Sequence, residues 1–66
     1  MSLSLEFCEM RAGECADAAD AAALDNVRDR ERRSEAAWRA LATQIKAVRD
    51  GRKALEDARA AAEADA

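Results

Sequence analysis

The chain lacks several residue types on which enzyme active sites commonly depend, since its 66 residues include no histidine, no tyrosine and no proline. Without histidine it cannot form a serine–histidine or cysteine–histidine catalytic pair, and it has no imidazole ligand for a metal ion. Aromatic residues are limited to one phenylalanine and one tryptophan. We therefore expect a protein that is not an enzyme and has no catalytic residues, no metal site and no cofactor.

Large apolar side chains are also scarce. Half of the residues are hydrophobic, but 19 of these are alanine, which leaves fourteen larger apolar side chains. A chain this short buries little surface by itself, and small domains commonly compensate with disulfides, metals or oligomerisation. The composition therefore predicts a homo-oligomer, in the simplest case a dimer.

Long apolar runs are missing as well, because none approaches the roughly 18 residues of a membrane span. Residues 1–10 lack the basic start and apolar middle of a signal peptide. Cys8 and Cys15 are seven residues apart, which on a helix is about 10 Å of rise and beyond the reach of a disulfide. We therefore expect a cytoplasmic protein without membrane contact, whose reduced thiols act as small apolar side chains.

Helix-forming residues dominate what is present, with alanine, glutamate, arginine, aspartate and leucine abundant and only two glycines. From Leu5 onward, small and apolar residues recur every three or four positions, which predicts a helix over about residues 5–23. Ser4 is placed to cap its N-terminus. Asp25 and Asn26 favour a reversal of the chain, which we place at residues 24–26.

A second helix is predicted over about residues 27–50, with an extension to about residue 64, because larger apolar residues recur there with the same spacing. Gly51 leaves three alternatives: it ends this helix, it begins a short third helix, or it lies within a continuous helix at a cost of about 1 kcal/mol relative to alanine. The spacing continues to Leu55, so we favour a continuous helix.

Folding the two predicted helices back on each other sets small residues of the first against large residues of the second, as dense packing requires. Residues 1–24 carry one arginine and five acids, whereas residues 25–50 carry seven basic and five acidic residues, so the segments attract. We therefore predict an all-α, antiparallel two-helix hairpin that dimerises into a four-helix bundle. The predicted core pairs are Leu5 with Val48, Cys8 with Ile45, Ala12 with Leu41, and Cys15 with Trp38.

A second set of apolar side chains lies outside this core and is the predicted surface for a protein partner or a sister subunit. The alternative is scattered exposure, which is normal for soluble proteins. The predicted surface combines a cluster on the first helix with a row of alanines on the second: Leu3, Phe7, Met10, Ala36, Ala40, Ala47 and Ala54.

The charged residues raise two alternative functions. Arg28, Arg32 and Arg39 lie along one side of the second predicted helix, where a dimeric hairpin would use them to contact the phosphates of RNA. The acids of the first helix, from Glu6 to Asp20, would instead bind a host protein if the chain were an inhibitor of the phage or mobile-element type. For both groups we favour a solvated, salt-bridged helix face, and we do not expect nucleic-acid binding.

Three short motifs are spread over residues 7 to about 45: Arg11-Ala12-Gly13-Glu14-Cys15, Asn26-Val27-Arg28 and Ala37-Trp38-Arg39-Ala40-Leu41-Ala42. In this pattern the chain resembles short uncharacterised bacterial proteins in which an Arg-Ala-x-x-Cys helix is followed by a Val-Arg turn and an Ala-Trp-x-x-Leu-Ala helix. That family has no assigned activity, so the resemblance implies a helical hairpin without a mechanism. We predict a small regulatory or structural protein that acts through protein–protein interaction.

Overall fold

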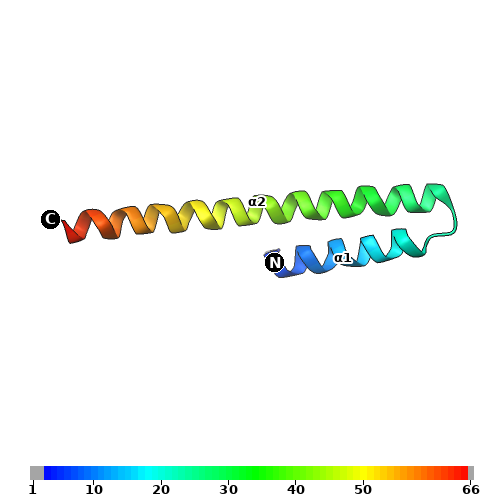
Figure 1. The fold of residues 1–66 in the computed structure, drawn as a ribbon, viewed down its shortest axis with the longest axis horizontal. Coiled ribbons are helices and arrows are strands. Elements are labelled where there is room, and N and C mark those ends of the chain that lie inside the picture. The colour runs from blue at the N-terminus through cyan, green and yellow to red at the C-terminus, as the bar shows by residue number, and fades with distance from the viewer. Residues whose placement is uncertain (1–2, 66) are drawn as a thin grey trace.

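The computed structural model describes residues 3–65 and consists of two antiparallel helices joined by a short turn (Figure 1). Helix α1 runs from Leu5 to Ala21, and helix α2 runs from Asp25 to Ala64. No strand occurs within residues 3–65, which confirms the all-α hairpin. Because α2 has 40 residues and α1 has 17, the molecule is a rod of 63 × 19 × 15 Å in which the C-terminal part of α2 projects beyond α1.

The start of α1 is fixed by Ser4, whose side chain accepts a hydrogen bond of 3.0 Å from the Phe7 backbone amide. Glu6 lies in the first turn, where an anion interacts favourably with the helix dipole. This cap satisfies one of the backbone amides that a helix N-terminus otherwise leaves unpaired.

The turn lies at residues 22–24, two residues earlier than predicted. Asp25 is the first residue of α2 rather than part of the turn, and a carboxylate there is stabilised by the helix N-terminus. Arg28 links the start of α2 to the turn, because its guanidinium donates to the Asp25 carboxylate at 3.2 Å and to the Ala22 carbonyl at 3.1 Å.

This displacement changes the register of the hairpin, since moving the centre of the turn by two residues shifts the pairing by about four residues, or one helical turn. Trp38 was expected opposite Cys15, but its indole lies beside Phe7 and Arg11, which are nearer the start of α1. Val48 was expected in the core, and it is 58% exposed. Both predictions were wrong for this one reason.

The core is made of small residues of α1. Cys8, Ala12 and Ala19 are fully buried, and Cys15 is 5% exposed. The larger residues predicted for the core are only half-buried, namely Leu5, Trp38, Leu41 and Ile45. The buried layer is therefore thin. Most of the large apolar side chains that face it belong to α2.

Helix α2 continues through Gly51 to Ala64 without a break, and no third helix occurs within residues 3–65. Gly51 does not have a positive φ, and a Cβ added there would meet nothing within 4 Å. Its backbone is thus compatible with any helix-forming residue.

Candidate functional site

An aromatic cluster joins the first half of α1 to α2. The rings of Phe7 and Trp38 meet edge to face, with centroids 5.6 Å apart and planes at 80°, and the Arg11 guanidinium lies 5.6 Å from the Trp38 ring centroid. Phe7 was predicted on a face that the hairpin does not use; this was wrong, although the side chain remains 39% exposed. The other members of that predicted cluster, Leu3 and Met10, are exposed.

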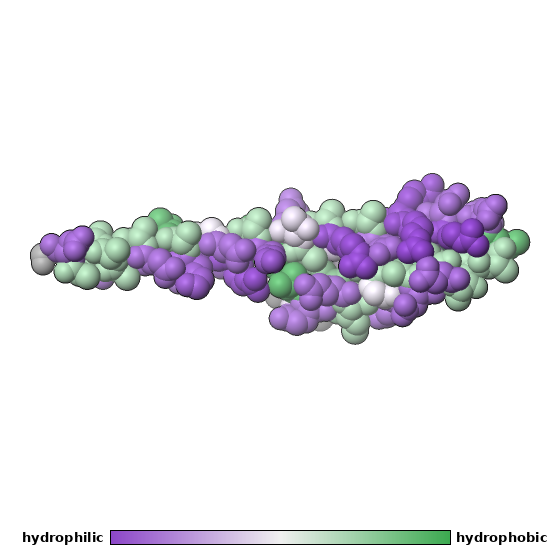
Figure 2. All heavy atoms as spheres, viewed as in Figure 1, coloured by the Kyte–Doolittle hydropathy of each residue, from purple (hydrophilic) through white to green (hydrophobic). Residues whose placement is uncertain are grey.

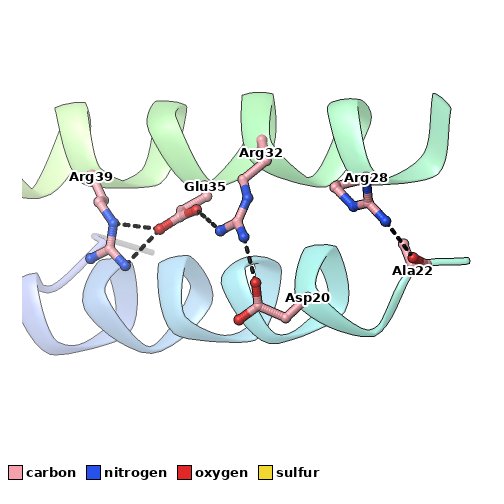
Figure 3. Close-up of polar contacts among 6 residues, drawn as sticks. All are labelled: Asp20, Ala22, Arg28, Arg32, Glu35 and Arg39. Atoms are coloured by element: carbon pink, nitrogen blue, oxygen red, sulfur yellow. Dashed lines mark hydrogen bonds and ion pairs between the residues drawn. The ribbon is translucent and has the colours of Figure 1, made fainter. Parts of the chain in front are cut away.

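One ion pair, Arg32 with Asp20, joins the two helices near the turn, and it belongs to a network of ion pairs that continues along α2 (Figure 3). Arg32 of α2 donates to Asp20 of α1 and, at 3.0 Å, to Glu35, which also accepts from Arg39 at 2.8 Å. The hydrogen bonds from Arg39 and then Arg32 lower the pKa of Glu35, and those to Glu35 and Asp20 raise the pKa of Arg32. The network therefore favours the charged form of each of these two groups.

Each of the three arginines that the RNA-binding alternative would use forms an ion pair within the chain. Arg28 pairs with Asp25, whereas Arg32 and Arg39 share Glu35. Figure 2 shows the most hydrophilic residues gathered on α2 toward the turn, where these pairs lie. The positive charge of this face is therefore matched by acids of the same chain.

Both cysteines are free thiols buried in the core between the helices. Within residues 3–65, no group of three or more cysteine, aspartate or glutamate side chains is arranged to hold a metal ion. The buried thiols thus act as small apolar side chains in the packing.

A groove of about 750 Å³ lies where α1 begins and α2 continues without it. Its apolar floor comes from both helices, and the charged residues around it come mainly from α2. The apolar members are Leu5, Leu41, Ile45 and Val48, and the charged members are Glu6, Arg49, Arg52, Lys53 and Glu56. The groove is the point at which α1 stops covering the apolar side of α2.

Every residue from 46 to 65 is exposed, including those of α2 that line the groove from Val48 onward; we call residues 46–64 of α2 the projecting segment. It carries the two most exposed large hydrophobic residues of α2, Val48 at 58% and Leu55 at 56%. Hydrophobic and hydrophilic residues are interspersed along it (Figure 2). Ala36, Ala40, Ala47 and Ala54, which were predicted to contact a partner, are exposed as well.

The apolar spacing of the hairpin core continues along the projecting segment. Trp38, Leu41 and Ile45 recur at intervals of three and four residues in the part of α2 that α1 covers. The same intervals then continue through five positions that we call the open seam: Val48, Arg52, Leu55, Arg59 and Ala62. The sequence predicted that this spacing continues to Leu55, but the predicted partner surface on the second helix was the row of alanines rather than these five positions.

Neither helix contains, within the described residues 3–65, a stretch long and apolar enough to cross a membrane. Comparisons with protein-family models, with curated proteins and with solved structures found no match to this chain. The open seam and the groove beside it are the exposed apolar features at which α1 no longer covers α2.

Proposed function

We propose that the protein is a non-catalytic interaction module that binds a helix of a protein partner along the open seam. In this proposal its role is regulatory or structural, in the cytoplasm, and it works as part of a complex.

The observation that carries the proposal is the exposure of Val48 and Leu55 on a single helix in line with a packed core. Residues spaced by three and four positions form the contact side of paired helices, and each fits between side chains of a facing helix. The groove at Leu5 supplies an apolar end to the same surface. A helix is therefore the occupant whose shape suits the seam.

The exposed alanines form a second surface on a neighbouring face of α2. Successive residues of a helix are separated by about 100°, so Ala54 lies about 100° round the helix from Leu55. We propose the open seam rather than this alanine face as the main contact, because alanine buries much less apolar area than leucine or valine.

A substitution series at neighbouring positions tests the proposal. Leu55→Lys places a charge in the open seam, Ala54→Lys places it on the alanine face, and Ala60→Lys places it about 140° from Leu55, outside both. Lysine is a good helix former, so the three variants differ in position rather than in helix propensity.

We expect Leu55→Lys to lose binding of any partner recovered by the immobilised wild-type chain, including the chain itself. Ala60→Lys should retain it, and circular dichroism should show equal helix content in both. Loss in Ala54→Lys alone would transfer the contact to the alanine face. Equal binding by all three variants would contradict a function of the open seam.

A further inference from the structure

We draw no further inference here: the strongest candidate, the side of α1 on which Phe7 and Met10 are exposed in line with the acids Glu14 and Asp17, carries none, because nothing in the structure shows what covers it and an acidic helix face alone does not define a site.

Discussion

The aromatic contact between the helices permits a quantitative prediction. Replacing a buried tryptophan by alanine costs about 3–5 kcal/mol, and Trp38 is half-buried, so burial alone gives about 2 kcal/mol. The edge-to-face contact with Phe7 adds about 1 kcal/mol, and the Arg11 guanidinium over the ring adds about 0.5 kcal/mol. We expect Trp38→Ala to lower the free energy of unfolding by about 3.5 kcal/mol.

That loss is large for this protein. A domain of 66 residues has a stability of about 3–10 kcal/mol, so Trp38→Ala would leave it close to unfolding. Urea denaturation followed by circular dichroism measures the change at a fixed protein concentration, which matters if the chain self-associates. Trp38→Leu retains apolar volume, and it provides a folded variant if Trp38→Ala does not fold.

A double-mutant cycle isolates the contribution of the contact between Phe7 and Trp38 to the free energy of unfolding. Phe7→Ala, Trp38→Leu and the double variant should give a coupling energy of about 1 kcal/mol. Met10→Ala is the matched control, since Met10 is a large exposed residue of the same helix and should cost less than about 1 kcal/mol. A coupling energy near zero would refute the view that the two rings hold α1 on α2.

Three further predictions concern the core, the ion pairs and Gly51. Ala12→Leu should destabilise the hairpin by about 1–3 kcal/mol because Ala12 is fully buried, whereas Ala18→Leu on the exposed side of α1 should be nearly neutral in urea denaturation. Because the pKa of Glu35 is lowered in the fold, its contribution to stability should be fully present above the ordinary glutamate pKa of about 4.3 and lost as the pH falls through the lowered value. Glu35→Gln should remove that part of the acid dependence, and an unchanged profile would contradict the assignment. Gly51→Ala should raise helix content and stability by up to about 1 kcal/mol, since the added Cβ meets no atom within 4 Å.

The helices and the small-residue side of the core were accessible from the sequence because they depend on local periodicity. Cys8, Ala12 and Cys15 recur at helical spacing and are buried, and Ser4 caps α1. The position of the turn was not accessible in the same way, because aspartate favours both turns and the first positions of a helix. Asp25 takes the second role, and the resulting shift of one helical turn moved Val48 out of the core.

The surface available to a partner was predicted only in part, because it too depends on how the two helices are placed against each other. Periodicity tells which residues share a helix face, but it does not tell how far a long side chain reaches across to a neighbouring helix. Trp38 reaches Phe7, so one residue assigned to the outer face is a contact of the hairpin. The open seam depends on where α1 begins relative to α2, and that follows from the turn rather than from either helix alone.

The difference in size between the two sides of the core links folding to association. The buried residues are two cysteines and two alanines of α1, whereas the large residues of α2 remain half-buried or exposed. Closing the hairpin therefore uses only part of the apolar area that α2 offers, and the largest exposed apolar side chains of α2, Val48 and Leu55, lie in the open seam. A partner on that seam binds the folded chain and has no matching surface in the unfolded chain, so it stabilises the fold by mass action. Small domains often gain stability from such support, so the partner that we propose for the open seam would also stabilise the hairpin.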